Sequence, residues 1–127
     1  MEMQALGRHI LAEVYGCDFS TLNDLDKIRD ILVRAAVSAG AEVREVAFYR
    51  FSPQGVSGVV VISESHLAIH TWPEFGYAAL DVFTCGDRVD PWVALHEAKD
   101  AFGASAFKAE EVKRGIVEGC FAQCAGS

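Results

Sequence analysis

The sequence predicts an α/β (α+β) fold, a two-layer sandwich in which a mainly antiparallel sheet carries two helices on one face. Three observations lead to this prediction. Several short segments rich in β-branched and aromatic residues alternate between apolar and polar positions, as half-buried strands do. Two longer segments repeat apolar residues every three or four positions, as amphipathic helices do. Turns rich in Gly and Pro separate these segments, and the length suits one domain, residues 1–127.

The first strand and the first helix lie in the N-terminal third of the chain. Residues 6–15 mix β-branched and aromatic residues with polar ones and are expected to form a strand. Between residues 21 and 39, apolar side chains recur at helical spacing and line one face. Ser20 or Thr21 is expected to cap the start of this helix, and Gly40 is expected to end it.

The next three segments predict strands that follow one another closely. Residues 42–51 resemble a strand, and the turn sequence at residues 52–55 joins them to the β-branched segment 56–62, which predicts a hairpin. Residues 67–71 then continue as a strand almost without a gap. A bulge or a sharp corner is therefore expected at residues 63–66, although this segment contains no Gly or Pro.

The C-terminal part is expected to add a strand, a helix and a last strand. Residues 72–76 predict a turn, and residues 77–84 alternate as a strand does. Asp90 and the proline that follows it are a typical helix start, and the apolar face extends to residue 102. Residues 105–112 predict the last strand, and residues 115–127 are expected to form a mobile tail.

Charge and cysteine content exclude several classes of function. A formal net charge of −7 disfavours nucleic acid and anionic lipid as partners, whereas it suits cationic ligands. No secretion signal and no apolar segment of membrane-spanning length is apparent, so a cytoplasmic protein without membrane contact is expected. The four cysteines are then expected to be thiols, and neither a disulfide nor a metal site is predicted for them: Cys17, Cys85, Cys120 and Cys124.

Residues 55–85 combine reactive side chains with segments apolar enough to form buried strands. They contain three serines, two histidines, two glutamates and one cysteine. Burying so many polar side chains destabilises a fold, so their presence indicates a site with a chemical function. Ser65 stands beside Glu64 and His66, and His70 follows, so a nucleophile and candidate bases lie close in sequence. Along a strand, however, the two histidines share one face and Ser65 points to the other. No known nucleophile, phosphate or zinc motif is present, and no metal is expected.

Four motifs in order resemble a known family. They are LGRH at residues 6–9, GVSGVVVISESH at residues 55–66, HTWPE at residues 70–74 and DVFTCG at residues 81–86. Together they resemble the short prokaryotic S-adenosylmethionine decarboxylases, and the likeness covers roughly residues 5 to 115. The resemblance implies a carboxy-lyase that makes the aminopropyl donor for spermidine synthesis. It gives no role to the tail that contains Cys120 and Cys124.

The resemblance also implies that the chain is a proenzyme that cuts itself between Glu64 and Ser65. The products are a β chain, residues 1–64, and an α chain, residues 65–127. Ser65 then becomes a covalent pyruvoyl group, the expected cofactor. Its carbonyl condenses with the substrate amine and withdraws the electrons left when CO₂ departs, which no ordinary side chain can do. Residues 55–85 contain no lysine that could bind pyridoxal phosphate for the same purpose.

Further roles follow from the resemblance, residue by residue. His70 corresponds to the base of self-cleavage, and Ser57 to the serine that assists it. Cys85 corresponds to the acid that protonates the product carbon. Phe51 corresponds to an aromatic ring that stacks on adenine, and Glu74 to a carboxylate that binds the ribose hydroxyls.

Two alternatives to this function remain open at the level of sequence. An enzyme of the same pyruvoyl family that acts on arginine would share the residues of self-cleavage, so only Phe51 and Glu74 favour a nucleoside. A binding protein that keeps an intact chain is the other alternative, and replacing Ser65 by Ala would then leave its mass pattern unchanged. In each case the open face of the sheet, rich in apolar side chains, predicts a homodimer.

Overall fold

The computed structural model describes residues 4–63 and 65–117. Within these residues the chain forms six strands, three α-helices and one 3₁₀ turn. The elements, in order, are β1 (Gln4–Tyr15), α1 (Phe19–Leu22), α2 (Leu25–Ser38), β2 (Val43–Arg50), β3 (Val56–Ile62), β4 (Ser65–Trp72), η1 (Pro73–Phe75), β5 (Tyr77–Cys85), α3 (Pro91–Ala101) and β6 (Ala106–Val117).

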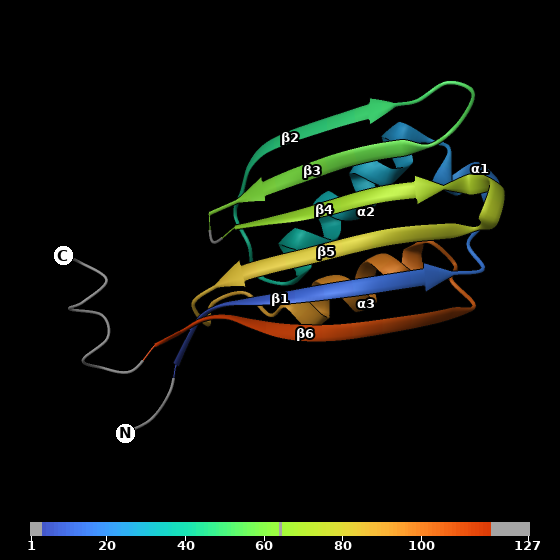
Figure 1. Cartoon of the computed structure of the whole chain (residues 1–127). Helices are drawn as coiled ribbons and strands as arrows, with labels where there is room; N and C mark the ends of the chain where they lie inside the picture. Colours follow the sequence, from blue (N-terminus) through green and yellow to red (C-terminus); the bar gives the residue numbers. More distant parts are fainter. Residues whose placement is uncertain (1–3, 64, 118–127) are drawn as a thin grey trace.

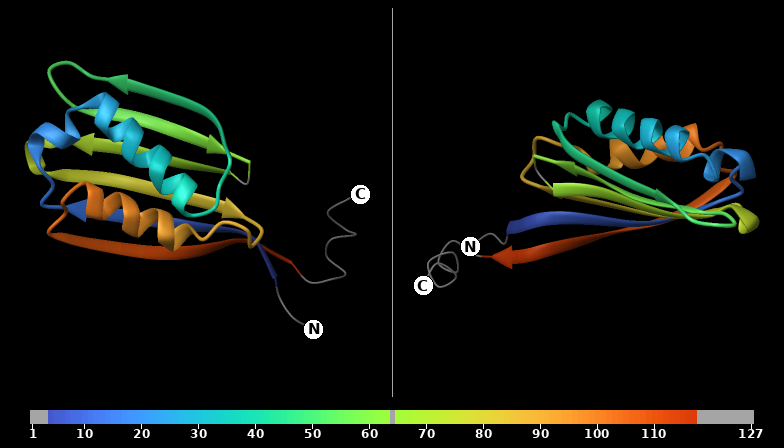
Figure 2. Two further views of the ribbon diagram at one scale, coloured as in Figure 1. Left: turned by 180° about the vertical axis from the view of Figure 1, so that it is seen from behind. Right: turned by 90° about the horizontal axis from the view of Figure 1, so that it is seen from above.

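The six strands form one sheet in the order β2-β3-β4-β5-β1-β6, and every neighbouring pair is antiparallel (Figure 1). Both long helices, α2 and α3, lie on the same face of this sheet, while the other face is uncovered (Figure 2). The predicted two-layer sandwich is therefore confirmed. Antiparallel strands need only short turns between them, which explains why β2 to β5 follow one another so closely in sequence.

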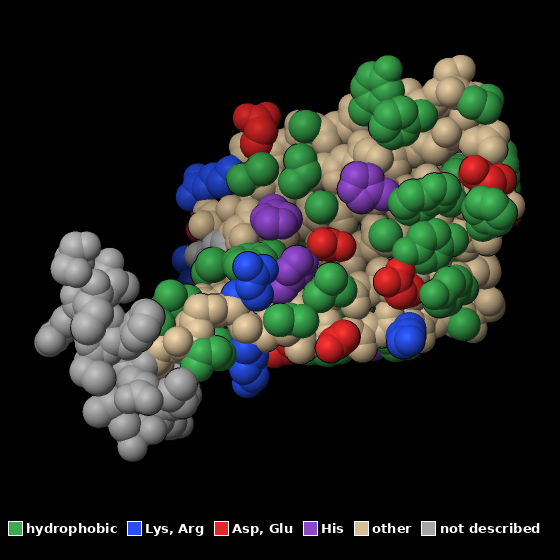
Figure 3. Space-filling view, in the orientation of Figure 1, with side chains coloured by type: hydrophobic (Ala, Val, Ile, Leu, Met, Phe, Trp, Pro, Cys, Tyr) green, Lys and Arg blue, Asp and Glu red, His purple; other side chains and the backbone are tan. Residues whose placement is uncertain are grey.

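Alternation along the strands separates the core from the open face. On β4, Leu67 and Ile69 are fully buried under the helices, whereas His66 and His70 point to the other side. The helix α2 contributes its buried face, including Ile28 and Leu32, to the same core. The open face consequently carries exposed apolar side chains together with histidines and carboxylates (Figure 3).

The first predicted helix differs from the structure. Residues 21–39 do not form one helix, because a short helix, α1, ends at Leu22 and a second, α2, begins at Leu25. The caps are Asp18, which accepts a hydrogen bond from the Thr21 amide, and Asp24, which accepts one from the Lys27 amide. Neither Ser20 nor Thr21 is the N-cap of the long helix, and that prediction is wrong. Its predicted end is confirmed, since Ala39 is the C-cap and Gly40 has a φ of 94°.

The corner predicted after β3 is a tight hairpin, because Ile62 pairs directly with Ser65. The last strand is longer than predicted, since β6 extends to Val117 and includes Gly115, which was assigned to the tail. The remainder of the predicted tail, with Cys120 and Cys124, lies outside the described residues. No helix in the described part of the chain is long and apolar enough to cross a membrane.

Candidate active site

A cavity of about 320 Å³ opens on the uncovered side, where β3 and β4 meet the turn before β3 and η1. Four of the residues singled out in the sequence line it: Phe51, Ser57, His70 and Glu74. The other lining residues, which sequence reasoning did not single out, are Gln54, Gly55, Thr71 and Trp72. Residues separated by up to 23 positions thus meet because β3 and β4 form a hairpin with a very short turn.

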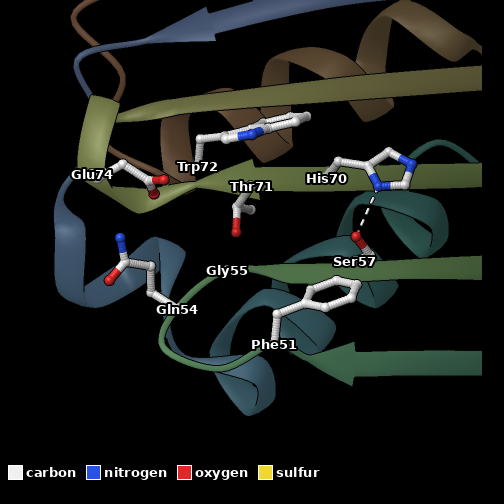
Figure 4. A pocket seen from close by; sticks show the side chains of 8 residues that line it. All are labelled: Phe51, Gln54, Gly55, Ser57, His70, Thr71, Trp72 and Glu74. Carbon is white, nitrogen blue, oxygen red and sulfur yellow. Dashed lines mark hydrogen bonds between the residues drawn. The ribbon is translucent and has the colours of Figure 1, made fainter.

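Ser57 and His70 are joined by a hydrogen bond. They face each other across β3 and β4, and Ser57 Oγ lies 2.8 Å from His70 Nδ1 (Figure 4). For His70 to act as a base through Nε2, Nδ1 carries the ring proton and donates it to Ser57 Oγ. This hydrogen bond then holds the imidazole in one orientation and in the tautomer whose Nε2 can accept a proton.

Two aromatic side chains form opposite sides of the cavity. Figure 4 shows the Phe51 ring and the Trp72 indole on these two sides, with Ser57 and His70 at one end and Glu74 at the other. Trp72 lies two residues after His70, so period-two alternation on β4 could have placed it on the same face. The arrangement suits a flat aromatic ligand that also carries hydroxyl groups.

The position of Trp72 depends on a neighbouring tyrosine. Its indole contacts the Tyr77 ring, with 5.3 Å between the ring centroids. The Tyr77 hydroxyl donates to the Glu13 carboxylate on β1. Burial, together with this bond, raises the pKa of Tyr77 to about 12, so the hydroxyl keeps its proton throughout the physiological range. The aromatic side of the cavity is therefore supported from two further strands.

The turn that carries Gln54 and Gly55 is held by the break between α1 and α2. The Asn23 side chain accepts a hydrogen bond from the Gly55 amide at 3.0 Å, and the Asn23 carbonyl accepts one from Arg50 at 3.2 Å. The Leu22 carbonyl accepts a hydrogen bond from the Thr71 hydroxyl at 2.8 Å. The interruption of the predicted helix thus supplies the groups that position one side of the cavity.

A second, more apolar hollow of about 380 Å³ adjoins the first and shares Ser57 and His70 with it. Its other lining residues belong to β2, β3 and β4: Ala47, Phe48, Tyr49, Gly58, Val59 and Ala68. The hydrogen-bonded pair therefore stands between a polar cavity and an apolar surface.

Ser65 begins β4 directly after the hairpin turn. It is the only residue other than glycine with a positive φ among those described, at 149°. Such a backbone conformation is costly for a residue with a Cβ atom, and strain of this kind is typical of functional sites. The Ser65 hydroxyl lies 3.4 Å from Nδ1 of His66, which is a long contact. Glu64, the residue expected before the cut, lies outside the described residues.

Cys85 ends β5 and is an exposed thiol. It pairs with Gly7 on β1, next to the pair formed by Ser65 and Thr84. Ser65 and Cys85 therefore lie at the same end of the sheet. Cys17, the other thiol in the described residues, is buried, and burial raises its pKa.

The structure does not bring Ser65 and Cys85 together with Ser57 and His70. Ser65 is five residues before His70 on one extended strand, a separation of about 17 Å. His70 pairs with Ala79 on β5, and Cys85 is six residues further along, about 20 Å away. The candidate residues thus form two groups at opposite ends of the same sheet, and the alternation of β4 puts the Ser65 side chain on the face of Thr84, opposite to that of His70.

Comparison with known proteins identifies the family. The family model for S-adenosylmethionine decarboxylase matches residues 8–115. A protein of Syntrophomonas wolfei named S-adenosylmethionine decarboxylase proenzyme is 69% identical over 116 residues, which cover 91% of this chain and 92% of the relative. A protein of the same name from Carboxydothermus hydrogenoformans is 64% identical over 121 residues, 95% of each chain.

A solved structure agrees with these sequence relatives. The crystal structure of the adenosylmethionine decarboxylase from Aquifex aeolicus superposes with a TM-score of 0.86 and 37% sequence identity, covering 91% of this chain and 96% of that one. The matched family model includes every candidate residue of the cavity as well as Ser65 and Cys85. The chain belongs to the S-adenosylmethionine decarboxylase family.

Proposed function

We propose that this chain is a proenzyme that cuts itself between Glu64 and Ser65 and then decarboxylates S-adenosylmethionine. The observation that carries the proposal is the cavity in which Phe51, Ser57, His70 and Glu74 meet. Their side chains supply a stacking surface, a hydrogen-bonded base and a carboxylate, the groups that a nucleoside with a reacting amino acid requires.

The residues at the start of β4 fit a pyruvoyl group made from Ser65. The backbone of Ser65 is strained, which suits a residue beside a bond that is cut, and residues 55–85 contain no lysine for a different carbonyl cofactor. When present, the pyruvoyl group supplies an electrophilic carbonyl that withdraws electrons from the substrate. Cys85, at the same end of the sheet, is proposed to return a proton to the product carbon.

Self-cleavage uses the chain's own atoms. The Ser65 hydroxyl oxygen attacks the Glu64 carbonyl carbon, the amide C–N bond breaks, and the proton moves to the nitrogen. The His70 of a second copy, held by the Ser57 of that copy, then removes the Cα proton of residue 65, and the Cβ–O bond breaks to release the Glu64 carboxylate. Water replaces the nitrogen and ammonia leaves, which generates the carbonyl.

Recognition of the substrate follows from the sides of the cavity. Phe51 and Trp72 present aromatic faces to the adenine, and Glu74 accepts hydrogen bonds from the ribose hydroxyls. The sulfonium of S-adenosylmethionine is a cation, so aromatic faces and a net charge of −7 both favour it. A free thiol at Cys85 persists in a reducing compartment, so we also propose a cytoplasmic enzyme.

The separation of the two residue groups supports a homodimer. Within one chain His70 cannot reach Ser65, because about 17 Å of extended strand lies between them. A twofold axis through the middle of the open face would place the Ser65 end of one sheet over the His70 end of a second copy. The face offers exposed apolar side chains for such packing, among them Leu11, Tyr49, Val61 and Trp72. One complete site would then use both chains.

A decarboxylation assay tests the substrate. The purified, cut protein should release CO₂ from S-adenosylmethionine and not from arginine, the substrate of the alternative reading. CO₂ from arginine alone would refute the proposed substrate while leaving the pyruvoyl chemistry intact. Replacing Glu74 by Gln should raise KM for S-adenosylmethionine by roughly tenfold or more, because a charge-assisted hydrogen bond to the ribose is lost.

A further inference from the structure

One buried hydroxyl in the core lacks a hydrogen-bond partner among the described residues. Thr84 on β5 is fully buried, and its Oγ1 forms no hydrogen bond with any of the residues that the structure describes. A buried polar group without a partner destabilises a fold, so each such group calls for an explanation. Thr71 on β4 provides a contrast, because its buried hydroxyl donates to the Leu22 carbonyl and accepts from the Val56 amide, both at 2.8 Å.

The register of the sheet places this hydroxyl next to the serine that is proposed to be cut. Thr84 is the partner of Ser65 in the pairing of β4 with β5. Residues directly opposite on antiparallel strands carry their side chains on the same face, with Cβ atoms about 4.5–5.5 Å apart, and Ser or Thr pairs at such positions form hydrogen bonds. Among the described residues the Ser65 hydroxyl makes only its long contact with His66, so the hydroxyls of both members of this cross-strand pair lack a strong partner.

We propose that Thr84 is a positioning residue for self-cleavage. In the conformer that attacks, the Ser65 hydroxyl donates a hydrogen bond to Thr84 Oγ1, which selects one of the three staggered rotamers of Ser65. The bond between Ser65 Oγ and the Glu64 carbonyl carbon then forms, the C–N bond breaks, and the hydroxyl proton passes to the nitrogen. Thr84 exchanges no atom. This proposal rests on the self-cleavage proposed above.

The rate of cutting gives the first test. Freshly synthesised chains with Thr84→Val, Thr84→Ser or the unchanged sequence are followed by intact mass under denaturing conditions. Val has the shape of Thr without the hydroxyl, so Thr84→Val removes only the proposed hydrogen bond. Cutting should therefore slow about tenfold, the change in rate that corresponds to the free energy of one hydrogen bond. Thr84→Ser keeps the hydroxyl and should cut within about twofold of the unchanged chain.

The stability of the uncut chain gives the second test. In a Ser65→Ala background, which cannot be cut by the proposed route, Thr84→Val should leave the melting temperature unchanged or raise it, because no hydrogen bond is lost. Thr71→Val in the same background is the matched control. It should lower the melting temperature by about 4 °C or more, because two buried backbone groups lose their partner.

The outcomes separate this proposal from the one on which it rests. Cutting of Thr84→Val at the unchanged rate would overturn the role of Thr84, and so would a fall in melting temperature as large as that of Thr71→Val. If the unchanged chain itself stays whole, self-cleavage fails instead. The proposed hydrogen bond between Ser65 and Thr84 would be supported by three results together: slow cutting of Thr84→Val, normal cutting of Thr84→Ser, and an undiminished melting temperature of Thr84→Val in the Ser65→Ala background.

Discussion

The hydrogen bond between Ser57 and His70 joins two neighbouring strands and fixes the base of the proposed site. Replacing His70 by Ala removes the group that takes the Cα proton, so the chain should remain whole or be cut about 10² to 10⁴ times more slowly. Intact mass over time measures the rate. His96→Ala is the control, since His96 is exposed on α3 in the helical layer and that variant should be cut normally. Normal cutting of His70→Ala would remove His70 from the mechanism.

Cys85 is proposed to act after the cut rather than during it. The variant Cys85→Ala should therefore yield both fragments as the unchanged chain does, while kcat for S-adenosylmethionine falls by about 10² or more through loss of the proton donor. The control is Cys17→Ala, because Cys17 is the other free thiol among the described residues and is buried away from the site. An undiminished kcat in Cys85→Ala would show that another group donates the proton.

Ser57, His70 and Glu74 were predictable because they lie within two of the family motifs, and Phe51 because the resemblance extends over it, but their hydrogen-bond partners outside the motifs were not. The sequence pointed to Phe51 and Glu74, and the structure places both on the cavity. It gave no sign that Asn23 would hold Gly55, because a side chain that bonds to a distant backbone amide leaves no local pattern. The roles of these residues in catalysis stay predictions.

At the scale of elements, local pattern predicted the strands and α3 well and the first helix less well. Apolar spacing continues across residues 21–39, so periodicity alone could not show the break at Asn23 and Asp24. The break is stabilised by capping carboxylates and by contacts with the turn before β3, which are tertiary. Tertiary contacts of this kind override helical spacing.

One ion pair links three elements and predicts a dependence on pH. Glu111 on β6 accepts hydrogen bonds from Arg8 on β1, at 2.9 and 3.1 Å, and from Trp92 on α3, at 2.7 Å. The bond with Arg8 is the main cause that lowers the pKa of Glu111 from its ordinary 4.5. A carboxyl with a lowered pKa stabilises the fold above its unfolded value and loses that contribution as pH falls through its folded value.

The variant Glu111→Gln should therefore have a lower free energy of unfolding than the unchanged chain at pH 7. Below about pH 4 the two free energies of unfolding should become nearly equal. Arg8 is 36% exposed, so solvent screening limits the difference to about 1 kcal/mol or less. Urea unfolding in a Ser65→Ala background, measured from pH 3 to pH 7, tests this. Glu110→Gln is the control, since Glu110 is exposed on the same strand. If the difference in free energy of unfolding does not shrink in acid, the charge of Glu111 is not what stabilises the fold.

At the scale of the molecule, the two-layer sandwich was predictable because apolar residues repeat every two positions in the strands and every three or four in the helices. The composition of one complete site was not predictable. The family resemblance implies that Ser65 and His70 act together, yet an extended strand keeps residues five positions apart at about 17 Å. The register of the sheet separates the two groups, and we propose that a second copy of the chain brings them together.

Mixed dimers test this arrangement. Chains carrying His70→Ala and chains carrying Cys85→Ala should each be inactive alone. When both are made together, about half of the dimers are mixed, and each mixed dimer contains one site with an intact His70 and an intact Cys85. Activity should then return to about a quarter of the unchanged level, and the His70→Ala chain should be cut only in the presence of the other. Without any recovery, each site would belong to one chain.

The central claim is that the chain generates its own pyruvoyl group, and the denatured intact mass of freshly purified protein tests it most directly. We predict two fragments that meet between Glu64 and Ser65, of which the second, ending at Ser127, reacts with a carbonyl-specific reagent. A single unreactive chain near 13.8 kDa that persists after long incubation would contradict the account.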